Sequence, residues 1–198
     1  MKITETYCRV EAGLGKGFSR EEIFRSLGGT DDVARVVAAT PHLDDRENFK
    51  MLNWVLVGII FYFAVLKLLT SVFLLVHLGI PIYLYPFAIL IPACAVALAL
   101  QIRKFRGVFY SVTGFSGLAV LCNGVDYFLK AGKHSLVFVA VLYLPVLLGS
   151  ILSFYLKKEL CPTLGFLGAK TDAGGRYLFQ HEAARQPDAP EERSRVSQ

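Results

Sequence analysis

Two ionisable side chains stand inside long apolar runs, and they have the clearest potential for chemistry in this sequence. Lys67 lies in the first of these runs and Asp126 in a later one. An ionisable group at membrane depth is costly and commonly marks a substrate, ion or proton pathway. Asn123 and Lys130 lie about one helical turn on either side of Asp126, so a helix would place these three side chains along one edge.

Lys67, Asn123, Asp126 and Lys130 therefore form a candidate intramembrane polar cluster with two open interpretations. In the first, the cluster lines a vestibule or handles a proton. In the second, Asp126 pairs with Lys130 and receives Lys67 from a neighbouring helix as an interhelical tie. Lys67 lies roughly 24 Å along a helix that starts at Met51, near the far interface, where a lysine can reach water. This depth favours the structural tie.

Four apolar stretches have the length and composition of membrane-spanning helices. A hydrocarbon core of ~30 Å needs about 20 apolar residues in a helix. The stretches are residues 51–77, 83–102, 108–129 and 135–156. Short links favour antiparallel neighbours, so we predict an all-α membrane protein with a four-helix transmembrane up-down bundle. The first helix ends between Thr70 and His77, and we favour the longer version because a long helix can tilt.

Basic residues gather on one side of these stretches. Eight Lys and Arg flank one set of helix ends, whereas two, Lys130 and Lys133, flank the other. Cytoplasmic loops carry such an excess, so we predict a cell-membrane protein, favouring a bacterial inner membrane, with both termini in the cytoplasm. We expect a set of inner-surface basic residues to contact anionic lipid headgroups. These are Arg103, Lys104, Arg106, Lys157 and Lys158.

Small residues on the third and fourth stretches predict close helix packing. Thr113, Gly117 and Gly124 share one helical face, and Gly149 and Ser153 lie on the fourth stretch. Small residues let helix backbones approach each other where lipid supplies no hydrophobic drive. The same pattern fits a seam between copies of the chain, so a homo-oligomer remains open.

The N-terminal region is charged and rich in helix-capping residues, which predicts three or four short helices. Ser19 and Glu22 have the spacing of a capping box, in which each side chain bonds the other's backbone. Thr30 is expected to cap the next helix. Asp44 and Glu47 predict a second capping box, opening a helix that continues into the first apolar stretch.

These patterns predict four regions along the chain. A cytoplasmic helical module is followed by the transmembrane bundle, a Gly-containing loop or hairpin in which TDAGG forms the turn, and a polar, disordered tail. The regions are residues 1–50, 51–156, 157–180 and 181–198.

The four cysteines form no CxxC pair, and we interpret them as small buried thiols rather than disulfide partners or zinc ligands. They are Cys8, Cys94, Cys122 and Cys161. The sequence carries no histidine pair with metal-ligand spacing and no phosphate-binding loop. We therefore expect no cofactor, no metal and no catalytic residue.

The resulting expectation is a non-enzymatic scaffold, regulatory or partner-binding membrane protein. Residues 1–50 are expected to contact a protein partner. Nucleic acid is disfavoured because Asp31 and Asp32 would face phosphate at the start of their helix. The alternative is a small transporter or channel component that uses Lys67 and the Asn123–Asp126 pair.

Overall fold

The computed structural model describes residues 3–78, 85–131, 136–165 and 168–179. This part of the chain is helical apart from turns, loops and two isolated β-bridges, which confirms the predicted all-α class for these residues. The chain divides into two compact units. The terminal unit comprises Met1–Thr40 and Pro162–Gln198, and the bundle unit comprises Pro41–Cys161.

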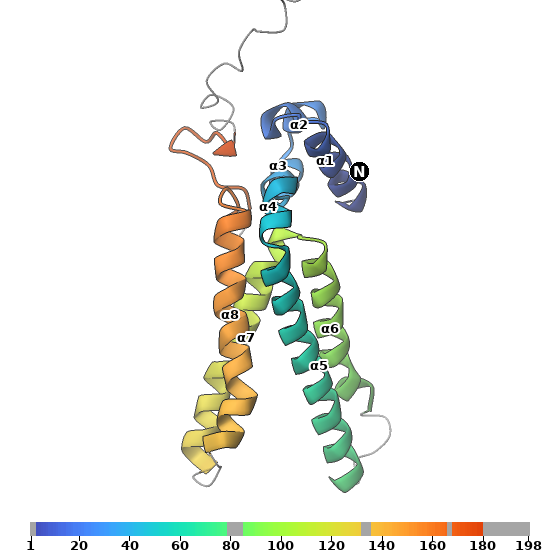
Figure 1. The fold of residues 1–198 in the computed structure, drawn as a ribbon, viewed down its shortest axis with the longest axis vertical. Helices are drawn as coiled ribbons and strands as arrows, with labels where there is room; N and C mark the ends of the chain where they lie inside the picture. Colours follow the sequence, from blue (N-terminus) through green and yellow to red (C-terminus); the bar gives the residue numbers. More distant parts are fainter. Residues whose placement is uncertain (1–2, 79–84, 132–135, 166–167, 180–198) are drawn as a thin grey trace, which may run out of the picture. The chain divides into compact units, whose positions relative to one another are not determined.

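Three short helices form the first part of the terminal unit (Figure 1). They are α1 (Ile3–Gly15), α2 (Arg20–Ser26) and α3 (Asp31–Ala39). Their inward faces carry apolar residues, and Val10, Ala34 and Val37 are fully buried. Helices of this length are marginal in water by themselves, so this shared core is what keeps them folded.

The segment that follows the last long helix packs within the same terminal unit. Phe24 lies edge-on to Tyr177 and to Phe179, with ring centroids 5.4 Å apart in each pair. The Tyr177 hydroxyl donates a hydrogen bond to the Asp31 carboxylate. This bond raises the pKa of Tyr177, because ionisation of the hydroxyl would abolish it. Residues from the two ends of the chain thus build one aromatic core.

The turn expected in TDAGG reverses the chain within this segment. Thr171 and Tyr177 form an antiparallel bridge across it. The Asp172 carboxylate accepts hydrogen bonds from the backbone N–H groups of Gly174 at 2.8 Å and Arg176 at 2.9 Å. Gly175 has a φ of 76°, a conformation that glycine adopts at little cost. The Asp172 side chain therefore stabilises the turn, because its carboxylate takes the place of a backbone carbonyl as the acceptor for these N–H groups.

Of the predicted caps, the Ser19 box and the N-cap position of Thr30 are confirmed, and the Asp44 box is wrong. Ser19 and Glu22 form the complete capping box. Thr30 is the N-cap residue of α3, although its side chain makes no cap hydrogen bond there. The helix α4 (Leu43–Asn48) begins after His42, so Asp44 lies inside its first turn and cannot open a capping box with Glu47. Acidic residues in that turn still favour the helix through its dipole.

The bundle unit contains α4 and, after it, four long helices. They are α5 (Lys50–Leu78), α6 (Tyr85–Arg103), α7 (Gly107–Ala131) and α8 (Leu136–Leu160). Each lies within a few residues of its predicted stretch, and α5 confirms the longer of the two versions of the first helix. A single residue, Phe49, separates α4 from α5.

The long helices pair as two hairpins, α5 with α6 and α7 with α8. The hairpins lie close together near the start of α5 and separate toward the other end (Figure 1). Contacts between α5 and α8 join them, with fewer between α6 and α7. The bundle is therefore closed at one end and open between hairpins further along.

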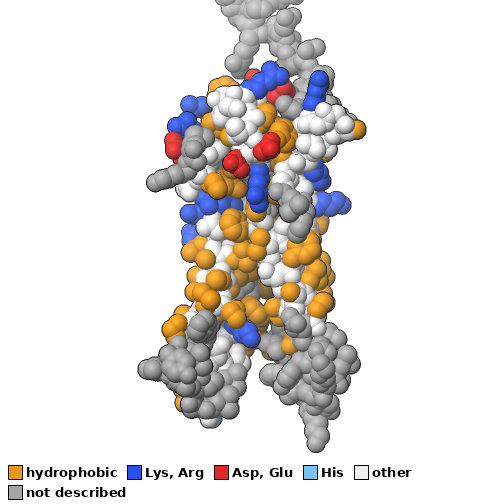
Figure 2. Space-filling view, turned by 180° about the vertical axis from the view of Figure 1, so that it is seen from behind, with side chains coloured by type: hydrophobic (Ala, Val, Ile, Leu, Met, Phe, Trp, Pro, Cys, Tyr) orange, Lys and Arg blue, Asp and Glu red, His pale blue; other side chains and the backbone are white. Residues whose placement is uncertain are grey.

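Apolar side chains are spread over the face of the bundle unit that Figure 2 shows. In the described part of the chain, the helix spanning Lys50–His77 is long and apolar enough to cross a membrane, with a mean hydropathy of 2.5. Ile89–Arg103 and Gly107–Cys122 are shorter apolar helical segments. One membrane-capable helix is thus observed, and the four crossings remain a prediction.

The prediction of buried thiols is wrong for three of the four cysteines. Cys8, Cys94 and Cys122 are exposed, whereas Cys161 is buried. An apolar run of sequence does not reveal which helical face is covered by a neighbour. Cys94 and Cys122 lie on faces that the neighbouring helices leave open.

The capping box makes the stability of the N-terminal end of α2 sensitive to acid. The backbone and hydroxyl of Ser19 both donate hydrogen bonds to Glu22, which lowers the pKa of that carboxyl. Its stabilising effect is therefore complete above the unfolded pKa of about 4.3 and is lost as the pH falls through the lower folded pKa. We expect the amide hydrogen-exchange protection of α2 to decline over that acidic window.

Two variants test the cap. Ser19→Ala should destabilise α2 by about 1 kcal/mol and remove most of the acid-dependent decline in protection. Glu22→Gln, which retains a side-chain acceptor, should keep protection nearly constant across the same window. Protection in Ser19→Ala that declines with acid as in the parent protein would contradict this account.

Candidate functional site

A buried polar network ties the long helices together at the closed end of the bundle. Asn53 on α5 is 2% exposed, and its amide donates to the Ile102 carbonyl of α6 at 3.0 Å. The Tyr110 hydroxyl of α7 donates to the Asn53 side-chain oxygen at 2.6 Å. The Ser153 hydroxyl of α8 donates to the Tyr110 carbonyl at 2.6 Å. We call these four residues the Asn53 clasp.

The clasp has one consistent assignment of donors and acceptors. The Ile102 carbonyl can only accept, so the nitrogen of the Asn53 amide must face it, and the oxygen must face Tyr110. Each long helix contributes one member. Because leaving a buried polar group unpaired costs more than pairing it gains, this network fixes the register of the two hairpins.

The clasp is not the polar cluster that the sequence predicts. Lys67 is exposed on α5. The side chains of Asn123, Asp126 and Lys130 lie outside the described residues. Asn53 carries no signal in the sequence, because a single asparagine close to the end of an apolar run has no distinctive spacing. Its pairing with Tyr110 crosses 57 positions of the chain.

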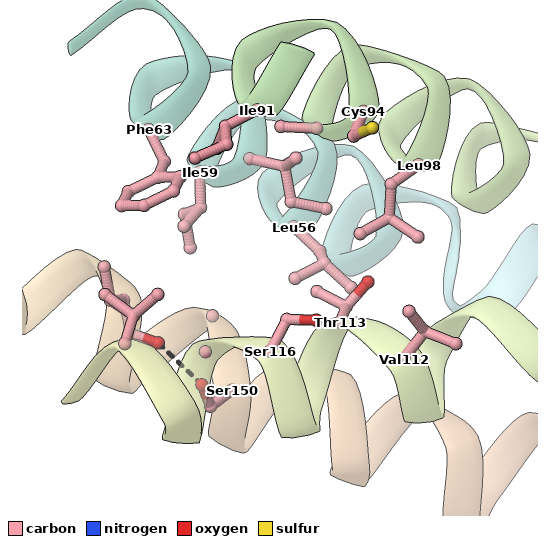
Figure 3. Close-up of a pocket in the computed structure, with 16 residues that line it drawn as sticks. Leu56, Ile59, Phe63, Ile91, Cys94, Leu98, Val112, Thr113, Ser116 and Ser150 are labelled. Atoms are coloured by element: carbon pink, nitrogen blue, oxygen red, sulfur yellow. Dashed lines mark hydrogen bonds between the residues drawn. The ribbon is translucent and has the colours of Figure 1, made fainter. Parts of the chain in front are cut away.

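An apolar cavity of about 330 Å³ lies between the two hairpins (Figure 3). Leu56 and Phe63 on α5 face it from one side, as do Ile91, Cys94 and Leu98 on α6. All four long helices line it. The full lining is Leu56, Ile59, Ile60, Phe63, Ile91, Cys94, Ala95, Leu98, Val112, Thr113, Ser116, Gly117, Val120, Val146, Gly149 and Ser150.

Three hydroxyl groups are the polar features of this lining. Thr113 donates to the Phe109 carbonyl at 2.9 Å, and Ser150 donates to the Val146 carbonyl at 2.9 Å, each within its own helix. Ser116 is exposed and supplies the third hydroxyl. With two of the three engaged by backbone, the cavity offers an occupant mainly apolar contact.

Small residues explain the close approach of α7 to α8 and of α8 to α5. A Cβ atom at Gly117 would lie 2.0 Å from the Ser150 hydroxyl oxygen, and one at Gly114 would lie 2.7 Å from the Phe154 ring. These contacts bring α7 against α8. A Cβ at Gly149 would meet Ile59 at 3.0 Å, where α8 faces α5. Glycine thus permits the close approach, because a neighbouring side chain occupies the space that a Cβ atom would need.

The other predicted packing residues have mixed placements. Thr113 lines the cavity, and Ser153 belongs to the Asn53 clasp. Gly124 lies outside the residues whose surroundings are described.

The basic residues predicted for the inner surface lie at the closed end of the bundle. Arg103 stacks over the Trp54 ring at 5.2 Å, and Arg106 donates to the Gln101 side chain at 2.5 Å. Lys104 and Lys158 are exposed, and Lys157 is half-buried in the last turn of α8. This end therefore combines positive charge with an aromatic side chain, as membrane interfaces commonly do.

Within the described residues, no group of three His, Cys, Asp or Glu side chains comes together as a metal site would require. The geometry instead offers an apolar binding space and a basic, aromatic-bearing edge.

No family model, curated protein or solved structure matches the chain. Its function is therefore inferred from the arrangement of its own residues.

The Asn53 clasp predicts a measurable coupling between two helices. Tyr110→Phe leaves the Asn53 oxygen unpaired and should lower the free energy of unfolding by about 1–3 kcal/mol. The double variant Asn53→Leu with Tyr110→Phe removes both partners, and should cost clearly less than the sum of the single changes. Thermal unfolding in detergent micelles measures these effects.

Tyr155→Phe is the matched control, since it removes a hydroxyl from an exposed tyrosine at the same end of the bundle. It should change stability little. If the losses in the free energy of unfolding from the single changes add up in the double variant, the clasp does not join the hairpins. An equal loss in Tyr155→Phe would show the same.

Proposed function

We propose that this chain is a multi-pass membrane protein that crosses the bilayer four times through α5–α8, with both termini in the cytoplasm. It is a non-enzymatic scaffold or regulatory protein, which holds its terminal unit at the inner membrane face to bind a protein partner.

The exposed apolar side chains of all four long helices carry this proposal, and Figure 2 shows one face of the molecule on which apolar side chains gather. Leu69 on α5 is 63% exposed, Ile91 on α6 is 54%, Phe115 on α7 is 47% and Leu148 on α8 is 51%. Soluble monomers rarely expose contiguous apolar patches above a few hundred Å². Lipid is the solvent that makes such a surface favourable, and a helix satisfies its own backbone groups there.

The polar groups of the bundle unit support the same orientation in the bilayer. The interior network of Asn53 and Tyr110 is internally paired. At the closed end, Arg103, Lys104 and Lys158 can contact anionic headgroups, which attract basic residues at the cytoplasmic leaflet. Since α5 begins and α8 ends at this end, both parts of the terminal unit would emerge on the cytoplasmic side.

The terminal unit supports the partner-binding role. It has its own buried core, and a groove of about 420 Å³ lies between α1 and α2. Phe18 at this groove is 52% exposed. The lining combines apolar with charged side chains, which suits a protein surface. It consists of Arg9, Ala12, Gly13, Lys16, Phe18, Glu22, Ile23, Ser26 and Leu27.

The alternative of a small transporter has less support. Lys67 does not line the cavity between the hairpins, and the described lining carries no acid or base to handle an ion.

Photocrosslinking in intact cells tests the proposal with the full-length chain. A photoreactive amino acid at Phe18 should give a discrete adduct with a cytoplasmic protein. The same probe at Leu69, on the apolar surface of α5, should give no such adduct. Lys16→Glu, which reverses a charge in the groove without touching the core, should weaken the Phe18 adduct several-fold.

Three outcomes would overturn the proposal. Absence of any Phe18 adduct, or an adduct shared with the Leu69 probe, would remove the specific partner. An adduct with a protein from outside the cell would reverse the assigned orientation.

A further inference from the structure

The cavity between the hairpins opens sideways onto the apolar surface of the bundle unit. Several residues line it and are also exposed, among them Ile91 at 54% and Val112 at 46%. Leu90, the neighbour of Ile91, is 56% exposed. The interior of the cavity is therefore continuous with the surface proposed to contact lipid, and an occupant can enter along the helices.

The position of the cavity places it at mid-depth in the bilayer. On α5 it extends from Leu56 to Phe63, which is roughly 9–20 Å from the helix start at Lys50. The hydrocarbon core is about 30 Å thick. At this depth the surrounding solvent is acyl chain rather than water, provided that the proposed membrane crossing is correct.

The chemistry of the lining selects an apolar occupant. In the described part of the chain no charged side chain faces the cavity, so a phosphate headgroup would find no counter-charge. Water needs two to four polar partners in a buried site, whereas Thr113 and Ser150 already donate within their own helices. An empty cavity would forfeit dispersion contacts along its walls.

We propose that this cavity is a binding site for one acyl chain of a membrane phospholipid, whose headgroup stays outside the bundle. Its volume of about 330 Å³ lies within the usual range of ligand pockets. The flexible chain enters through the opening beside Ile91 and Val112 and packs against Leu56, Leu98 and Val120. The Asn53 clasp fixes the two hairpins relative to each other at one end of this space.

Native mass spectrometry of the purified full-length protein tests this site, after reconstitution with one synthetic phosphatidylglycerol and extraction into mild detergent. The parent protein should retain one phospholipid. Ala95→Phe fills the cavity from α6 and should lower retention by about tenfold, the effect of losing roughly 1.4 kcal/mol of binding. Ala97→Phe makes the same change at an exposed position of α6 outside the lining, and should retain the lipid.

Ser116→Phe fills the cavity from the opposite hairpin. It is a second filling variant, which keeps the test valid if Ala95→Phe misfolds. Both filling variants should unfold at least as high in temperature as the parent. Equal lipid retention in the parent and both filling variants would overturn the acyl-chain site. A mass of two protein chains without lipid would also overturn it, because the occupant would then be a second copy of the protein.

Failure of the membrane proposal gives a different result. A protein that is monodisperse in buffer without detergent, and that does not sediment with vesicles, would contradict the proposed function. Vesicle association without retained lipid would remove the acyl-chain site alone.

Discussion

One buried amide organises the bundle unit. Asn53 cannot enter an apolar interior unless both ends of its side chain are paired, and the pairs it finds are on different helices. That bond fixes Tyr110, and the backbone carbonyl of Tyr110 accepts a hydrogen bond from the Ser153 hydroxyl. Breaking any one of these hydrogen bonds would be costly. The bonds therefore restrain helices that are otherwise held together by weakly directional apolar contacts. Where the clasp ends, the hairpins separate and the cavity begins.

The same principle of satisfying polar groups explains why the two units differ. The bundle unit leaves apolar side chains exposed and pairs Asn53, Tyr110 and Ser153 in its interior, which suits the lipid surroundings proposed for it. The terminal unit buries its apolar residues in a core of its own, and it uses Ser19, Glu22 and Asp172 to satisfy helix ends and turns in water. Under the proposed function, each unit faces a different solvent.

Local signals were readable from the sequence, and long-range pairings were not. The apolar runs give the four long helices because their length and flanking links are local properties, and the Ser19 box depends on residues three positions apart. The Asn53–Tyr110 bond and the Phe24–Tyr177–Phe179 cluster join distant positions that carry no shared spacing. Cys94 shows the same limit, since composition alone does not say which face of a helix meets a neighbour.

Collision measurements on spin labels test the central claim, that α5–α8 all lie in the bilayer. Single labels at Val65, Ile89, Phe115 and Leu144 would report one exposed position on each long helix, with Lys104 as the control at the closed end. In lipid vesicles all four should collide with oxygen far more than with a water-soluble nickel complex, and Lys104 should show the reverse. Nickel access at any one of the four, equal to that at Lys104, would remove that helix from the membrane and contradict the account.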